Sequence, residues 1–269
     1  MKIAICLFGD TGTKDSMGRT FNKDFDKIEK LDFNVSLNSL KEKVISPNNC
    51  DVFIHSWAKD NELEIKNLLD PVSSQFEKYK TFSEPFHSRK NHIWSRFYSG
   101  YVSNKLKTDY EIRNGFKYDI VMTSRMDLFW FSKFNFQSDV SRNIYASHWN
   151  ESKRDNMLGP YDKKNLGLGW GVIDPWFYSN SKNMNNFTKI HKHKYYVSFK
   201  SYFKYMKLSQ RLKTFELRSN NYYISTHHFF HQQAMNFNLN IKFQYYRGID
   251  YELYRHTLKP GWTNKPEDE

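Results

Sequence analysis

Three continuous apolar runs along the chain each end at glycine or polar residues. The first run is KIAICLF at residues 2–8, closed by Gly9, and the second is CDVFIHSWA at residues 50–58. The third covers residues 118–124. Short uninterrupted apolar runs are typical of strands that are buried on both faces of a parallel sheet. The pattern therefore predicts three buried strands, with polar residues where each strand ends.

Between the second and third runs, residues 91–115 repeat apolar side chains near helical spacing. This helix is expected to stop at Asn114 and Gly115, because glycine commonly follows the last turn of a helix. The preceding segment, residues 60–80, mixes helix-like and polar stretches and is interrupted by Pro71. The order of strand, helix and strand predicts an open α/β sheet whose ligand site lies beyond the carboxyl ends of the strands.

The second half of the chain is less regular. Residues 143–149 are strand-like, and a glycine-flanked strand within residues 169–184 runs into Asp174 and a proline. Residues 185–215 are basic and aromatic and predict a helix, and residues 225–241 predict another helix followed by a strand. No internal repeat and no linker composition is evident, so we expect a single domain.

Composition narrows the class of partner without choosing one. The chain has 269 residues, a formal net charge of +12 and 18% aromatic residues. Such a charge predicts attraction to anions, which include nucleic acids, anionic membrane surfaces and phosphorylated small molecules. Cys6 and Cys50 are expected to be buried free thiols, which is typical of a reducing compartment. No apolar stretch approaches the roughly 20 residues that span a bilayer, so we expect no transmembrane segment.

Two charges, Arg125 and Asp127, interrupt the apolar pattern where the third strand ends. Side chains two positions apart point to the same face of an extended chain, so these two are expected to lie together. One interpretation is a mutual salt bridge that closes the strand. In the other, Asp127 holds a divalent cation or a sugar hydroxyl, while Arg125 faces a phosphate or fixes the carboxylate.

Three other segments suggest chemistry only weakly. The loop GDTGT lacks the Walker A lysine, but its backbone amides can cradle a nucleotide, and Arg19 is then a phosphate partner. His227 and His231 are one helical turn apart, with His228 where a zinc protease needs glutamate. The run at residues 191–207 is basic and aromatic, which favours either a polynucleotide-binding surface or a solvated helix face.

The order of several motifs resembles a family of glycosyltransferase-like proteins found in bacterial polysaccharide clusters, large viruses and phages. The motifs are KIAICLFG, DVFIHSW, SRFYSGYVSNKLKTDYE, NGFKYDIVMTSRMDL, GWGVIDPWFYSNSKNM, the helix at residues 227–239 and YELYR. The resemblance implies an α/β, Rossmann-like domain of the GT-A type, with a mostly parallel central sheet flanked by helices. In that fold an Asp-x-Asp motif after a central strand holds Mn²⁺ or Mg²⁺ on the diphosphate of a nucleotide-sugar.

By resemblance, Arg125-Met126-Asp127 replaces Asp-x-Asp, with Asp127 as the metal ligand. This replacement loses one carboxylate and gains a cation. Residues 1–130 would form the half that binds the nucleotide-sugar, a UDP- or GDP-sugar. The residues expected to bind this donor are Phe8, Gly9, Arg19, His55, Trp57, Arg96, Arg125 and Asp127.

Residues 131–269 would form the half of the same domain that binds the glycan acceptor. Asp174 is expected to be catalytic, as the base that deprotonates the acceptor hydroxyl, alongside Asp127 on the donor side. Relatives tend to carry a glutamate early in the helix here occupied by His228–Gln232. The residues expected to bind the acceptor are Trp170, Gly171, Trp176 and His228.

We therefore expect a nucleotide-sugar-dependent glycosyltransferase, located in the cytoplasm (the host cytoplasm for a viral protein) or peripheral to a membrane. Two alternatives stay open. One is a nucleic-acid-binding protein that uses the 191–207 surface, although no common nucleic-acid-binding signature accompanies it. The other is a nucleotide-binding relative without catalysis, which the missing second aspartate of the motif favours.

Overall fold

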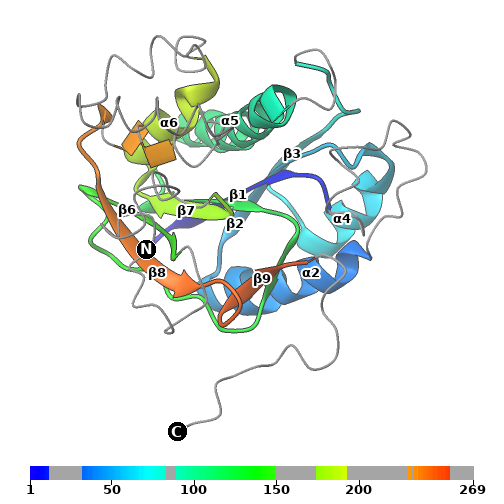
Figure 1. Ribbon diagram of the computed structural model, residues 1–269, viewed down its shortest axis with the longest axis horizontal. Coiled ribbons are helices and arrows are strands. Elements are labelled where there is room, and N and C mark those ends of the chain that lie inside the picture. Colours follow the sequence, from blue (N-terminus) through cyan, green and yellow to red (C-terminus); the bar gives the residue numbers. More distant parts are fainter. Residues whose placement is uncertain are drawn as a thin grey trace, which may run out of the picture.

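The computed structural model has an α/β fold in which a seven-stranded mixed sheet is flanked by helices (Figure 1). Six of these strands run in one direction, and β7 runs against both of its neighbours. The order across the sheet is β3 (Ser73–Phe76), β2 (Asp51–Ser56), β1 (Ile3–Gly9), β4 (Ile120–Arg125), β7 (Trp176–Ser179), β6 (Asn143–His148) and β8 (Asn240–Tyr246). The structure describes residues 1–11, 32–82, 89–148, 174–192 and 230–254, except 232 and 235.

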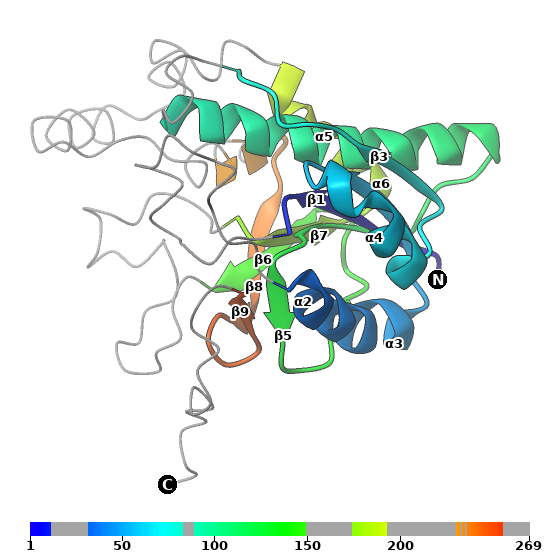
Figure 2. The same cartoon turned by 90° about the vertical axis from the view of Figure 1, so that its right-hand side faces the viewer.

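Helices cover both faces of the sheet (Figures 1 and 2). One face carries α5 (Arg89–Arg113) and α6 (Ser181–Thr188), which continues into the 3-10 turn η7 (Lys189–Lys192). The other face carries α2, α4 and a two-stranded sheet of β5 and β9. Their bounds, with the short turns between them, are α2 (Phe33–Leu40), the π-helical turn η2 (Lys41–Ile45), α3 (Ser46–Asn48), η3 (Lys59–Asn61), α4 (Glu62–Leu69), β5 (Leu128–Trp130) and β9 (Tyr251–Leu253).

Strand β1 shows how the apolar pattern forms two cores. Ile3, Ile5 and Leu7 belong to the core beneath α2 and α4. Ala4 and Cys6 alternate with them and belong to the core beneath α5 and α6. Because successive side chains of a strand point to opposite faces, an uninterrupted apolar run is needed where both faces are covered. The three predicted buried strands are confirmed as β1, β2 and β4.

Other expectations for the elements are confirmed in part. The long helix is present as α5, and Gly115 follows it with a φ of +67°. The strand at 143–149 is confirmed as β6. Strand β3 within the mixed segment 60–80 was not predicted, because SSQF is a short edge strand without an apolar run. The strand expected before Asp174 falls on residues outside the described ranges, and a strand that was not predicted separately, β7, follows Asp174.

The expectation of two buried cysteines is confirmed in part, because Cys6 is buried whereas Cys50 is only partly buried. Cys6 and Cys50 are free, and burial raises the pKa of the Cys6 thiol to about 12. Within the described residues, no helix is both long enough and apolar enough to cross a lipid bilayer.

Candidate functional site

The carboxyl ends of β1, β2 and β4 meet at one edge of the sheet. Phe8 of β1 lies opposite His55 of β2 on one side and opposite Arg125 of β4 on the other. The chain leaves β1 toward β2 and β3 and returns as β4 on the opposite side of β1, so the strand order reverses here. The polar residues that follow these strands therefore converge on one place.

The antiparallel strand β7 begins at this same edge. Its first residue, Trp176, pairs with Ser124 of β4, and the Arg125 N–H donates to the Pro175 carbonyl oxygen at 2.9 Å. Asp174, directly before Pro175, therefore lies beside the end of β4. It lies directly before the start of β7, and the residues before it, where the sequence predicted a strand, are outside the described ranges.

Arg125 and Asp127 form a two-pronged ion pair. Arg125 Nε donates to Asp127 Oδ1 at 2.6 Å, and Nη2 donates to Oδ2. The side chain of Arg125 is 20% exposed and that of Asp127 is 3% exposed. Burial lowers the pKa of Arg125, but the Asp127 carboxylate more than offsets this effect, so the pKa lies above its usual value. The salt bridge that the sequence left as one of two interpretations is present.

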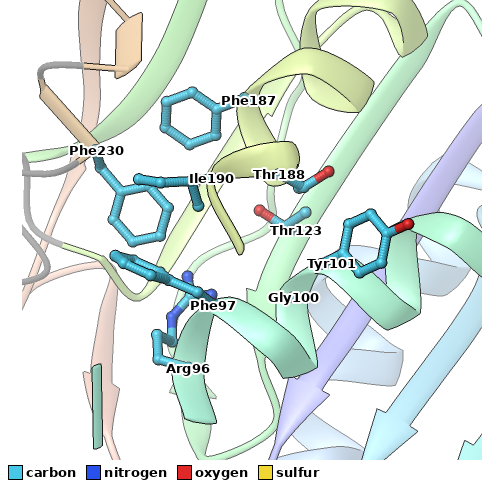
Figure 3. A pocket seen from close by; sticks show the side chains of 9 residues that line it. All are labelled: Arg96, Phe97, Gly100, Tyr101, Thr123, Phe187, Thr188, Ile190 and Phe230. Carbon is cyan, nitrogen blue, oxygen red and sulfur yellow. The ribbon is translucent and has the colours of Figure 1, made fainter. Parts of the chain in front are cut away.

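Arg96 of α5 lies between two aromatic rings. Its guanidinium carbon is 3.4 Å from the centroid of the Phe8 ring and 4.9 Å from that of the Phe230 ring. Gly100, one helical turn away, leaves room for the guanidinium, because a Cβ there would lie 2.8 Å from Arg96 Nη1. Arg96, Gly100 and Phe230 help to line a small pocket with a volume of about 10 Å³ (Figure 3). That is room for about one water molecule.

The same arginine holds Asp174. Arg96 Nη2 donates to the Asp174 carbonyl oxygen at 3.2 Å, and Nε lies 3.6 Å from the carboxylate oxygen Oδ2. Burial lowers the pKa of Arg96 to about 9, and Asp174 opposes this shift. The guanidinium is therefore charged at neutral pH. Two Arg–Asp pairs, Arg96 with Asp174 and Arg125 with Asp127, stand side by side at the carboxyl edge.

His55 is buried and supports the end of β1. Its Nδ1 lies 2.7 Å from Ser99 Oγ of α5, and the Gly9 N–H donates to the same hydroxyl oxygen at 2.8 Å. The Ser56 hydroxyl donates to the Gly9 carbonyl oxygen at 2.9 Å. Burial lowers the pKa of His55 to about 4, although Glu77, 3.8 Å from Nε2, raises it. The neutral imidazole thus fixes the turn at Gly9, whose φ is +99°.

Trp57 is covered by other aromatic side chains. Its ring stacks on that of Tyr98 with centroids 5.6 Å apart, and it is only 8% exposed. Tyr79 and Phe82 lie against other parts of the same ring. Trp57 also lies next to His55, so little of its surface is open to a ligand.

The remaining expected acceptor residues divide into one core residue and three that the structure does not describe. Trp176 is fully buried, and its ring packs against Trp130 and Phe134 in the core beneath α2. Its side chain therefore offers no exposed face to an acceptor. The residues outside the described ranges are Trp170, Gly171 and His228, together with Arg19 of the donor set and His227.

The residues at this edge do not fit a divalent cation. Mg²⁺ and Mn²⁺ take several oxygen ligands, and both Asp127 oxygens accept hydrogen bonds from Arg125. In the part of the chain that the structure describes, no three His, Cys, Asp or Glu side chains are grouped so as to hold a metal. The expected role of Asp127 as a metal ligand therefore has no support in this geometry.

Sequence reasoning missed three residues that build the site: Ser99, Gly100 and Phe230. A signal for two of them was present, because Ser99-Gly100 interrupts a helix in which both residue types are unfavourable. A glycine inside a helical pattern often marks a close approach of another group. Phe230 gave no such signal, because it lies far from Arg96 in the sequence.

The edge of the sheet thus defines a site with two arginines, two aspartates and a buried histidine. No protein-family model matches the sequence, and a search of curated proteins also finds no match.

Proposed function

We propose that the protein is a glycosyltransferase of the GT-A type, which transfers a sugar from a nucleoside diphosphate sugar to a hydroxyl group of a glycan acceptor. One observation carries this proposal: the Arg and Asp pairs lie where the strand order reverses. Strands β3, β2, β1 and β4 follow the order 3-2-1-4 of Rossmann-like sheets. Such sheets bind ligands beyond the carboxyl ends of the strands at this switch point.

The chemistry of the transfer suits the residues at this edge. Transfer passes through an oxocarbenium-like state, and the departing diphosphate must be stabilised by positive charge. Arg125 is the more exposed of the two arginines, so it is our candidate for that role. An inverting enzyme also needs a carboxylate that deprotonates the acceptor hydroxyl, and Asp174 is our candidate base. Phe8 and Gly9 would then form the floor beneath the donor.

The two proposed roles are connected through the backbone. The hydrogen bond from the Arg125 N–H to the Pro175 carbonyl oxygen links the donor side directly to the residue after Asp174. Residues 1–130 supply β1, β2 and β4, and residues 131–269 supply Asp174 and β7. We therefore assign the donor half to residues 1–130 and the acceptor half to residues 131–269 of one domain, and a cytoplasmic location is part of the same proposal.

A nucleotide-binding protein without transfer activity is the second candidate. The observation that favours it is the pairing of Asp127, because both oxygens of this carboxylate are already taken by Arg125. Binding of nucleic acid through residues 191–207 is a third class, and all but the first two of those residues lie outside the described ranges.

Two measurements separate these classes. Isothermal titration against UDP, GDP and a short oligonucleotide tests which ligand is bound, and a panel of UDP- and GDP-sugars tests for slow donor hydrolysis through release of the nucleotide. We expect binding of one nucleotide and hydrolysis of a matching donor. Nucleotide binding with every donor intact would favour the second candidate. Tight oligonucleotide binding without nucleotide binding would eliminate the glycosyltransferase.

A further inference from the structure

The guanidinium of Arg125 has two different edges. The hydrogen bonds that it makes to described residues use Nε and Nη2, and both go to Asp127. An arginine has five N–H groups in a planar fork, so the remaining ones, including those on Nη1, lie away from this carboxylate. Because the side chain is still 20% exposed, the outer edge is accessible at the carboxyl end of β4.

Asp127 is built to hold this arginine. Its side chain is 3% exposed, and its carbonyl oxygen accepts a hydrogen bond from the Tyr254 N–H at 2.7 Å. The backbone of Asp127 is therefore held by the chain that follows β9, while its carboxylate is held by Arg125 of β4. A two-pronged pair restricts the rotation of the guanidinium plane, so the outer edge of Arg125 keeps one direction.

A divalent cation at Asp127 would oppose this arrangement. It would have to displace Arg125 from both oxygens, leaving a largely buried guanidinium without its partner. Arg96 lies close enough to Arg125 for the two charges to influence each other, so a dication would face repulsion from both. A phosphate group would be attracted by both arginines, because a guanidinium group can donate two parallel hydrogen bonds to two phosphate oxygens.

We propose that this site binds a nucleoside diphosphate without a divalent cation, and that Asp127 acts as a positioning residue which presents the outer edge of Arg125 to the diphosphate. This inference rests on the proposed function, since it specifies how the donor is held. Asp127 then touches Arg125 and not a metal.

The test measures binding of UDP and GDP by isothermal titration in EDTA and again with Mn²⁺. We expect equal affinity in the two conditions. Arg125→Ala should weaken binding about tenfold or more, because a charged hydrogen bond is lost. Arg125→Lys keeps the charge but not the fork, so it should bind more weakly than the wild type. Asp127→Asn should also weaken binding in EDTA. The matched controls are Arg142→Ala and Asp109→Asn at exposed positions, and both should bind as the wild type does.

Electron paramagnetic resonance of Mn²⁺ with the protein alone gives a readout that is independent of activity. We expect the wild type and Asp127→Asn to give the same Mn²⁺ signal, because Asp127 does not bind the metal. Nucleotide binding that requires Mn²⁺ and disappears in Asp127→Asn would overturn this inference and leave the glycosyltransferase proposal intact. Metal-free binding that is unchanged in Arg125→Ala would also overturn it. Failure of UDP and GDP to bind in either condition would overturn the proposed function, and this inference with it.

Discussion

Helix α5 carries two buried cations in two different settings. Arg96 and Lys107 are about three helical turns apart, so one lies at the carboxyl edge of the sheet and the other toward the opposite edge. Lys107 is fully buried, and its Nζ donates to Glu111 at 3.0 Å, to Ser181 at 2.7 Å and to Asn185 at 2.8 Å. An ammonium group has three donors, so every one of them is used.

Arg96 differs because its hydrogen bonds are incomplete. Its Nη2 donates to Asp174, while its buried Nε has no hydrogen-bond partner among the residues that the structure describes. Burial lowers the pKa of both cations. A buried cation whose donors are all used stabilises one arrangement, here the packing of α6 on α5. A buried cation with unused donors next to an exposed edge is typical of a site that awaits a ligand.

The largest expected effect concerns the partner of Arg96. Replacing Asp174 by asparagine removes the proposed base, so Asp174→Asn should lower kcat by roughly 10²–10⁴-fold with donor affinity intact. Steady-state kinetics combined with nucleotide titration measures both quantities. An unchanged rate would move the base to a residue within 228–232, or would favour a retaining mechanism that needs no such base.

Lys107, in contrast, should matter for folding. Lys107→Met removes the buried cation from Glu111 and leaves only the exposed Lys117, 3.7 Å away, and breaking such a buried pair lowers the free energy of unfolding by roughly 3–5 kcal/mol. Urea unfolding measures this change, and kcat of the folded protein should be unaltered. Lys105→Met is the matched control, because Lys105 pairs with Asp109 on the exposed surface, where a pair contributes about 0–1 kcal/mol. Equal losses in the two variants would contradict the comparison.

His55 is a buried titratable group that is uncharged in the folded protein, unlike Arg96 and Lys107. The folded ring has a pKa of about 4, while the unfolded ring takes up its proton near the ordinary value of 6.5. Acid therefore favours the unfolded state, and the free energy of unfolding should fall as the pH drops from about 6.5 to about 4, by about 1.4 kcal/mol per unit of pKa difference.

The variant His55→Gln should show a shallower decline over the same pH range, measured by urea unfolding at several pH values. Glu77, whose pKa is lowered, is present in both proteins and contributes its own loss at the acid end. Parallel curves for the wild type and the variant would show that His55 is not the group that titrates.

The smallest expected effect comes from adding a single methyl group at Gly100. A Cβ at Gly100 would push the end of the Arg96 side chain aside, so Gly100→Ala should lower kcat about tenfold through misplacement of Asp174. Alanine favours the helix by about 1 kcal/mol, so the protein should be no less stable. Gly115→Ala is the control, because its positive φ predicts lower stability with kcat unchanged. A normal kcat in Gly100→Ala would show that the position of Arg96 does not affect catalysis.

Much of the fold follows from the apolar pattern, because burial on both faces leaves a continuous run in β1, β2 and β4. The pattern also predicted that Arg125 and Asp127 share a face. It did not predict β3, whose edge position demands little apolar character. It also did not predict that β7 begins two residues after Asp174, while the strand expected before Asp174 lies in residues outside the described ranges.

The sequence could not predict which residues of the site contact each other, and the reason is physical. The contacts of Arg96 with Phe8, Asp174 and Phe230 join four segments that only the folded sheet brings together. Alternation and helical spacing describe neighbours along one element, so they are silent about such contacts. The sequence showed that charges gather at the carboxyl edge, and the structure shows which charge pairs with which.

The close approach of Arg96 to Gly100 predicts that positions 96 and 100 vary together among related proteins. Arg96 occupies the space that any larger residue at position 100 would need. A lineage that acquires such a residue is therefore expected to replace Arg96 by a shorter side chain, and a lineage that retains Arg96 is expected to retain glycine at position 100. Covariation between these two positions would identify relatives that keep the same arrangement, even where the rest of the helix has diverged.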